Sequence, residues 1–111
     1  AKWPRLLQKL AFGDMFNKPI ETVLWPAGLK KLTFACKFDQ AIERVTWPPG
    51  LEVLEFGDDF NMPIAGANFP DSLQTLTFGE NFCQPVHNIS WPHALQYLHL
   101  KNNQYAGHFE R

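Results

Sequence analysis

The sequence predicts a β-rich, right-handed solenoid of five 22-residue coils, each contributing one short strand to a parallel sheet. Aromatic–proline pairs recur every 22 residues without insertion or deletion, and a Leu-x-Phe alternation returns at the same interval. Prolines also interrupt most segments that connect one alternation to the next. A fixed period of this length is typical of solenoids, in which each unit buries its apolar side only against its neighbours.

The aromatic–proline pairs divide the chain into its coils. They are Trp3-Pro4, Trp25-Pro26, Trp47-Pro48, Phe69-Pro70 and Trp91-Pro92. The predicted coils therefore span residues 3–24, 25–46, 47–68, 69–90 and 91–111, and together they form one repeat domain over residues 1–111. The 111 residues include 45% hydrophobic residues, which is enough apolar content to fold one domain without disulfides or metals.

One strand is expected in each coil, at the Leu-x-Phe alternation. Alternate side chains of a half-buried strand point to the same face, so the Leu and the Phe should both point inward. The inward pairs are Leu10/Phe12, Leu32/Phe34, Leu54/Phe56, Leu76/Phe78 and Leu98/Leu100. Five strands spaced by about 4.8 Å would make a sheet roughly 20 Å wide.

The segment after each strand is predicted to turn and return without a helix. Gly13, Gly57 and Gly79 share the first turn position, which we interpret as a need for backbone angles that other residues resist. A second inward aromatic follows at Phe16, Phe38, Phe60 and Phe82, and the prolines beyond it leave a convex side that is extended or carries short 3₁₀ turns. Asn17, Asp39 and Asn61 share one position and are expected to hydrogen-bond the turns of adjacent coils.

Two motifs within the unit resemble known repeats. Residues 73–82 and 95–103 read LxxLxLxxN, similar to a leucine-rich repeat, and the runs FGDMFNKPI (12–20) and FGDDFNMPI (56–64) resemble the FNIP repeat, a 22-residue relative. The resemblance covers essentially the whole chain. The second and fourth coils depart from it but keep the apolar positions, and the fifth resembles an ordinary leucine-rich repeat that ends in a polar cap. The resemblance implies a leucine-rich-repeat-like fold of the α/β class and a protein-interaction or scaffolding array, commonly part of a longer polypeptide, with no catalytic residues to carry over.

The outward strand positions are the predicted partner-binding face. By analogy with leucine-rich repeats this face should be concave, and its residue types vary while the inward positions stay apolar. Val53 and Tyr97 are the expected anchors, because aliphatic and aromatic side chains often dominate interfaces. The two outward columns are Lys9, Lys31, Val53, Thr75 and Tyr97, and Ala11, Thr33, Glu55, Thr77 and His99.

Charge and hydropathy narrow the class of partner. A formal net charge of −1 argues against a general nucleic-acid or membrane-surface binder, and the chain lacks the roughly 18 consecutive apolar residues of a membrane span. Residues 1–46 carry eight Lys/Arg and four Asp/Glu (+4), whereas residues 47–111 carry two and seven (−5), so the array has a basic and an acidic end. These features are compatible with the protein partner that the FNIP resemblance implies.

The first coil should expose an apolar end. No preceding segment covers Leu7 and Leu10, and an open sheet edge normally invites association. The sequence thus predicts either a fragment of a longer array or a subunit that makes an end-to-end contact through its N-terminal coil.

Metal sites are not expected. Carboxylates that gather in the third coil could in principle hold Ca²⁺, but their spacing matches no calcium motif. The four histidines lie at different stations around the coil, so they should not converge on Zn²⁺. The residues concerned are Glu52, Glu55, Asp58 and Asp59 with Asp14 and Glu80 in neighbouring coils, and His87, His93, His99 and His108.

Nucleophilic catalysis is not expected either. Cys83 and His87 form the one local Cys–His pair, but nothing nearby supplies an oxyanion hole or orients a base. Cys36 and Cys83 lie two coils, or about 10 Å, apart, beyond the roughly 7 Å between Cα atoms that a disulfide spans. Free thiols and the lack of a signal peptide favour an intracellular location, and the Asn88 sequon would matter only in a secreted protein.

Three functions remain open at this point. The first is a non-catalytic interaction or scaffolding module that binds a protein through its concave strand face. The second is an accessory subunit of a large assembly, docked through its exposed N-terminal coil. The third is a small-ligand or carbohydrate binder, which would require exposed tryptophan rings, whereas the repeat pattern places the tryptophans at buried coil corners. No cofactor is implied by any of the three.

Overall fold

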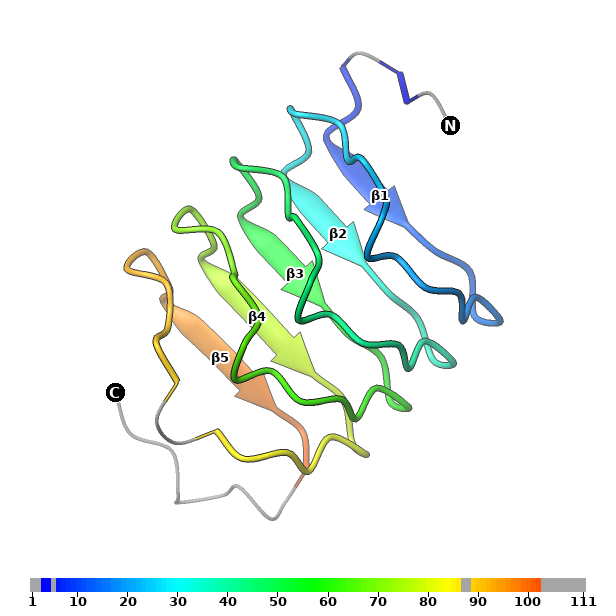
Figure 1. Cartoon of the computed structure of the whole chain (residues 1–111), viewed down its shortest axis with the longest axis vertical. Coiled ribbons are helices and arrows are strands. Elements are labelled where there is room, and N and C mark those ends of the chain that lie inside the picture. Colours follow the sequence, from blue (N-terminus) through cyan, green and yellow to red (C-terminus); the bar gives the residue numbers. More distant parts are fainter. Residues whose placement is uncertain (1–2, 5, 87–88, 103–111) are drawn as a thin grey trace.

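The computed structural model describes residues 3–4, 6–86 and 89–102 of the chain. These residues form one sheet of five parallel strands in sequence order, within a body of 42 × 31 × 20 Å (Figure 1). The strands are β1 (Lys9–Ala11), β2 (Lys31–Thr33), β3 (Val53–Glu55), β4 (Thr75–Phe78) and β5 (Tyr97–Leu100). The predicted solenoid with one short parallel strand per coil is confirmed.

Each strand pairs with the next in a register of 22 residues. Lys9 lies opposite Lys31, and the same offset holds through to Thr75 opposite Tyr97. Backbone bonds extend the pairing beyond the strands, because the amide of Lys30 donates to the carbonyl of Gln8 over 2.7 Å and its equivalents do the same in later coils. The repeat period is therefore also the hydrogen-bonding register.

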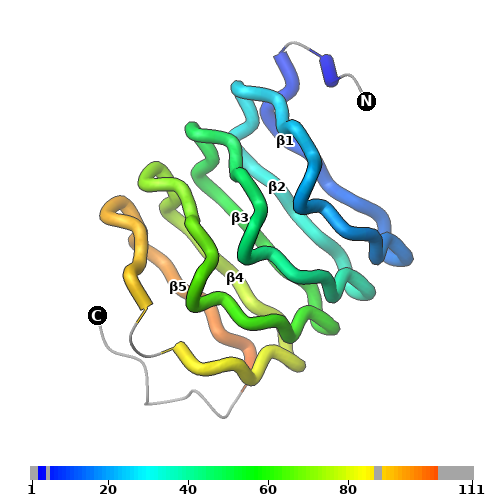
Figure 2. The backbone as a smooth tube through the Cα atoms, viewed as in Figure 1, coloured from blue at the N-terminus to red at the C-terminus, as the bar shows by residue number. Residues whose placement is uncertain are grey.

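The return side of each coil consists of tight turns joined by extended segments. In each turn a backbone amide donates a hydrogen bond to the carbonyl three residues earlier. Examples are Phe16 to Gly13, Val23 to Ile20 and Leu29 to Pro26, at 3.1–3.2 Å. Figure 2 shows these return segments running in front of the strands, as a second layer. The prediction of a convex side without helix is confirmed for the residues described, among which there is also no helix of the length and apolar character that a membrane span requires.

The core between the two layers is a set of aromatic columns. Phe12, Phe34, Phe56 and Phe78 stack at centroid distances of 5.1–5.6 Å, and Phe16, Phe38, Phe60 and Phe82 stack at 6.0–6.1 Å. The two columns touch within each of the first four coils, at 4.2–4.4 Å. Leu32, Leu54 and Leu76 are fully buried beside them. Because the rings of each coil pack on those of the next from the first coil to the fourth, the core is continuous along these coils.

The turn glycines are required for a different reason than the one predicted from the sequence. None of the glycines whose backbone angles are described has a positive φ, so unusual backbone angles do not explain them. Instead, a Cβ on Gly57 would overlap with the carbonyl of Ala35, and a Cβ on Gly79 would overlap with the carbonyl of Gly57. The absence of a side chain lets the third and fourth coils approach the coil before them at this corner, whereas the second coil carries Ala35 at the same repeat position.

A ladder of amide and carboxylate side chains links the coils on the other side of this turn. The Oδ1 atoms of Asn17, Asp39 and Asn61 accept the backbone amides of Asp39, Asn61 and Cys83, respectively, each over 2.9 Å. The Nε2 atoms of Gln40 and Gln84 donate to Asn17 and Asn61. The predicted contacts between Asn/Asp side chains and adjacent turns are confirmed.

Removing one rung of this ladder should destabilise the stack. We expect Asp39→Ala to lower the free energy of unfolding by about 1–2 kcal/mol, because it leaves the part-buried amide of Asn61 without an acceptor. Asp39→Asn is the matched control and should stay within about 0.5 kcal/mol, since Asn17 and Asn61 already use an amide oxygen there. Chemical denaturation of the two variants makes the comparison, and equal losses would contradict the ladder's role.

Candidate interaction surfaces

The outward side chains of the five strands form one continuous face, called here the strand face. It consists of the two predicted columns, Lys9, Lys31, Val53, Thr75 and Tyr97, and Ala11, Thr33, Glu55, Thr77 and His99. The members on β2, β3 and β4 are half-buried, and those on β1 and β5 are exposed. Pairing of the strands brings all the predicted binding residues together on one side of the sheet.

Neighbouring side chains on this face already contact one another. The hydroxyl of Thr33 donates to Oε1 of Glu55 over 3.1 Å. The rings of Tyr97 and His99 stack with 6.2 Å between their centroids and 11° between their planes, and Tyr97 is 57% exposed. These contacts hold the polar and aromatic groups in place while leaving their outer surfaces accessible.

A shallow hollow lies at the β1–β2 end of the strand face. It has a volume of about 300 Å³ and is lined by Lys9, Leu10, Ala11, Lys31 and Thr33. Its space exists because Ala11 carries only a methyl group at a position where the other coils carry larger side chains. In the described residues neither lysine makes an ion pair, so two free ammonium groups border the hollow.

The acidic residues of the third coil are used in contacts between coils. Oδ1 of Asp58 accepts the amide of Glu80 over 3.2 Å, and Oδ2 of Asp59 lies 4.0 Å from Nζ of Lys37. The part of the chain that the structure describes contains no group of three or more His, Cys, Asp or Glu side chains that could hold a metal ion. His87 and His108 lie outside the described residues.

The two cysteines are free and exposed. The amide of Cys83 ends the side-chain ladder, and the carbonyl of Cys36 accepts the amide of Asp59 over 3.0 Å. Cys36 thus lies in the turn after β2 and Cys83 lies just beyond the turn after β4, and the backbone of each links two coils. The proposed partner of Cys83 in a nucleophilic pair, His87, and the sequon residue Asn88 lie outside the described residues.

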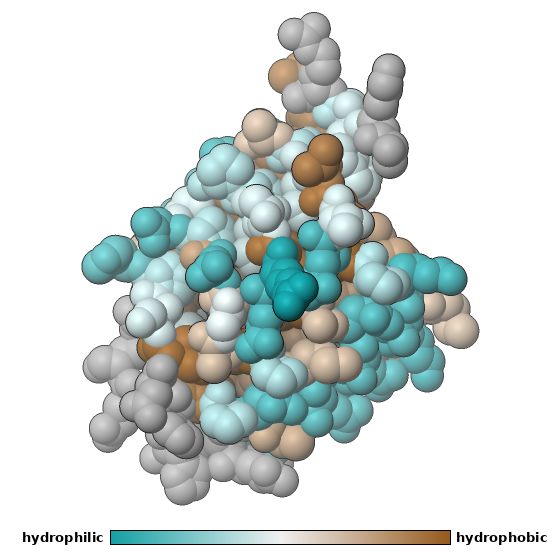
Figure 3. All heavy atoms as spheres, in the orientation of Figure 1, coloured by the Kyte–Doolittle hydropathy of each residue, from teal (hydrophilic) through white to brown (hydrophobic). Residues whose placement is uncertain are grey.

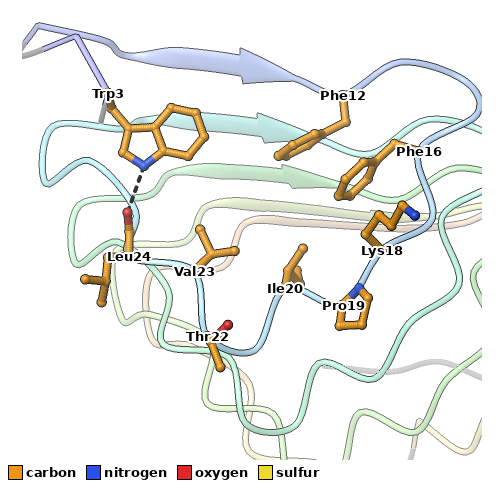
Figure 4. Close-up of a pocket in the computed structure, with 9 residues that line it drawn as sticks. All are labelled: Trp3, Phe12, Phe16, Lys18, Pro19, Ile20, Thr22, Val23 and Leu24. Atoms are coloured by element: carbon orange, nitrogen blue, oxygen red, sulfur yellow. Dashed lines mark hydrogen bonds between the residues drawn. The ribbon is translucent and has the colours of Figure 1, made fainter. Parts of the chain in front are cut away.

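A second exposed surface covers the end of the first coil. An open hollow of about 450 Å³ lies there, bordered by aromatic and aliphatic side chains that include Trp3, Phe12 and Phe16 (Figure 4). Leu24, which lines the hollow, is 86% exposed, and two further large apolar side chains of the first coil, Leu6 (91%) and Met15 (79%), are also strongly exposed. Figure 3 shows apolar groups reaching the surface at the upper end of the molecule, where Figure 1 places the first coil.

The sequence predicted an exposed apolar surface on the first coil, but not the residues that form it. Leu7 and Leu10, which were expected to be uncovered, are half-buried. The strongly exposed side chains are Leu6, Met15 and Leu24, at positions that the ladder of inward residues does not include. They could have been found by comparing coils, because later coils carry small or polar residues there.

The order and spacing of these features match a known repeat family. The model of the FNIP repeat matches residues 38–81 and 60–103. The chain belongs to the FNIP-repeat family. This FNIP chain is also similar to a solved structure, that of CroV588, described as a novel circular LRR protein, with a TM-score of 0.83 and 38% sequence identity.

That similarity covers most of the FNIP chain but little of its relative. The match spans 91% of this chain and 15% of CroV588. The search of curated proteins found no match. The FNIP repeat and the leucine-rich-repeat-like fold are typical of protein-interaction modules.

Proposed function

We propose that this FNIP array is a non-catalytic protein-interaction module whose partner lies across the strand face. The observation that carries the proposal is the strand face itself, a continuous surface whose side chains are excluded from the core by the alternation of the strands. Its residue types are free to vary because packing does not dictate them. The buried positions on the same strands are uniformly apolar.

The strand face changes character from one end to the other. Lys9 and Lys31 stand beside the hollow at the β1–β2 end, Val53 lies in the middle, and Tyr97 stacks on His99 at the β5 end. Four strand spacings of about 4.8 Å separate the ends, so an extended segment of about six residues would reach across. The chemistry fits a partner segment that is acidic at one end and apolar or aromatic at the other.

A carbohydrate-binding role is less well supported. Stacking of sugars needs open indole faces, whereas Trp3, Trp25, Trp47 and Phe69 stack on one another at 6.2–6.5 Å along the coil corners. Trp47 is only 6% exposed. The described tryptophans therefore act mainly as part of the packing between coils.

Partner capture by variants of the strand face tests the proposal. We expect Tyr97→Ala combined with Lys31→Glu to reduce retention of the specific partner at least tenfold, because it removes the exposed aromatic anchor and reverses one of the two free charges. Affinity capture followed by quantitative mass spectrometry measures the change. The midpoint of thermal unfolding should stay unchanged, since both side chains lie outside the core.

The matched control reverses a charge on the opposite side of the coil. Arg44 is exposed in a return-side turn, so Arg44→Glu makes the same charge change as Lys31→Glu far from the strand face. It should leave capture intact. Equal capture by the strand-face double variant and the wild type would exclude the strand face as the binding surface.

A further inference from the structure

The hollow between β1 and β2 on the strand face has the features of a subsite for an anionic group. We propose that it takes one carboxylate side chain of the partner, held between the ammonium groups of Lys9 and Lys31. This inference rests on the proposed function, because it assigns the chemistry of one contact within the strand face. Three observations support it: a like-charge pair across two strands, a space left by one small residue, and a nearby carboxylate that is already engaged.

The like-charge pair is the first observation. Lys9 lies directly opposite Lys31 in the pairing of β1 with β2, at a strand spacing of about 4.8 Å. Like charges in directly opposite positions of a sheet repel each other. Among the described residues neither lysine forms an ion pair, whereas the adjacent Lys30 lies 3.9 Å from the carboxylate of Glu52. A carboxylate between Lys9 and Lys31 would replace one repulsion with two attractions.

The space beside this pair is the second observation. Ala11 follows Lys9 on the outward side of β1, at a position where the later strands carry larger side chains. Its methyl group leaves the hollow of about 300 Å³ that both lysines line. Leu10 and Ala11 give this hollow an apolar part, which suits the methylene groups of an acidic side chain. The charge and the space therefore occur at the same place.

The carboxylate of Glu55 is the third observation. Glu55 is the one acidic residue in the two columns of the strand face. It lies diagonally across from Lys31 in the pairing of β2 with β3, within the reach of long side chains. Even so, its Oε1 atom accepts the hydroxyl of Thr33 over 3.1 Å, and the described contacts include no ion pair between Glu55 and Lys31. The strand face thus leaves the charge of its lysines for a group from outside.

The donors at the hollow favour a carboxylate over a phosphate. The hydroxyl of Thr33 already donates to Glu55, so the ammonium groups of Lys9 and Lys31 are the remaining side-chain donors that line the hollow. A phosphate carries nearly two negative charges and three acceptor oxygens, and it is best matched by the planar fork of arginine, which does not line this hollow. The single charge and two oxygens of Asp or Glu match two ammonium groups.

A carboxylate in the hollow also fixes the register of the partner. The hollow lies between β1 and β2, so about three and a half strand spacings, or about 17 Å, separate it from Tyr97 on β5. An extended chain covers that distance in about five residues. We therefore expect the partner to carry its acidic residue about five positions from the apolar or aromatic residue that meets Tyr97.

Selection from a peptide library tests the inference. A phage-displayed library of random peptides of about twelve residues is selected on the 111-residue chain, and the enriched peptides are synthesised with a fluorescent label. We expect them to share an Asp or Glu about five residues from an apolar or aromatic residue. Changing that Asp to Asn, or that Glu to Gln, should weaken binding at least tenfold in fluorescence polarisation, because the two ammonium groups lose their counter-charge.

Variants of the chain locate the acidic residue of the peptide. Lys9→Gln combined with Lys31→Gln should weaken binding of the acidic peptide at least tenfold, and the change from acid to amide in the peptide should then have no further effect. Ala11→Leu should weaken binding to a similar extent, because it fills the hollow while keeping both charges. The midpoint of thermal unfolding should not fall in either variant, since these side chains lie outside the core.

Matched controls make the same changes on the return side of the coils. Lys18→Gln combined with Arg44→Gln removes two positive charges from exposed positions there, and Ala41→Leu enlarges an exposed alanine there. Both controls should bind the acidic peptide as the wild type does. Equal weakening by the controls and by the variants of the hollow would overturn the subsite, because net charge or general surface effects would then explain the loss.

The remaining outcomes separate this inference from the proposed function. Peptides that lose binding on Tyr97→Ala but tolerate Lys9→Gln with Lys31→Gln would overturn the carboxylate subsite and leave the strand face as the binding surface. A peptide with phosphoserine in place of its acidic residue that binds more than tenfold tighter would overturn the carboxylate in favour of a phosphate. Enriched peptides that are insensitive to all of these variants would overturn the proposed function and this inference together.

Discussion

Replacing Phe60 by alanine is expected to lower the free energy of unfolding by about 3–5 kcal/mol, which is a large part of the 5–15 kcal/mol that typically separates folded from unfolded domains. Phe60 is 0% exposed and stacks on Phe38 and Phe82 at 6.1 Å and on Phe56 at 4.3 Å. Its removal leaves a cavity that interrupts one aromatic column at its middle. Circular dichroism during denaturation in urea measures the loss.

Phe16→Ala is the matched control for this prediction. Phe16 occupies the same repeat position, but among the described residues it stacks on one neighbouring coil, at Phe38, and it borders the open hollow of the first coil. Truncation there removes fewer contacts and creates no closed cavity, so we expect roughly half the loss or less. A loss as large as that of Phe60→Ala would show that stacking along the column does not set the stability.

Gly57→Ala should also be strongly destabilising, at about 1–3 kcal/mol or more. The added methyl group would overlap with the backbone of Ala35, including its carbonyl carbon and oxygen. A backbone cannot rotate away as a side chain can, so the two coils would have to separate and stretch the sheet pairing between β2 and β3. Differential scanning calorimetry measures the shift.

Gly28→Ala provides the comparison. A Cβ on Gly28 would lie 3.8 Å from the carbonyl oxygen of Leu7, which is an ordinary contact, and its backbone angles suit other residues. We expect no loss and a gain of up to about 1 kcal/mol, because alanine restricts the unfolded chain. If both substitutions had the same effect, close approach of the coils would not explain Gly57.

Much of the fold follows from the period of the sequence. A solenoid with a constant 22-residue unit brings residues 22 apart into contact, so the strand alternation and the second aromatic predict the core columns correctly. The ladder of Asn17, Asp39 and Asn61 was predicted for the same reason, because a polar side chain that recurs at one turn position meets the turn of the next coil. The membership of the strand face follows from the same alternation, whereas its role in binding stays a prediction.

The glycine turn could not be predicted correctly from local rules. A glycine after a strand usually indicates unusual backbone angles, and nothing in one coil distinguishes that case from close approach by another coil. The exposure of Leu6, Met15 and Leu24 was not predicted because nothing within the first coil distinguishes these residues from buried apolar ones. Only the contrast between Leu24 and the exposed Thr46 in the next coil shows that the first coil differs.

The sequence by itself determined the repeat unit, the register of the strands and the identity of the inward residues, because these depend only on which positions recur at a constant interval. The tertiary structure alone decided what each recurring residue does, because that depends on whether another coil lies beside it. Gly13 and Gly57 occupy identical positions in their repeats, yet one borders empty space and the other the backbone of Ala35. The structure alone likewise decided that Leu7 and Leu10 are half-buried while Leu6, Met15 and Leu24 are exposed.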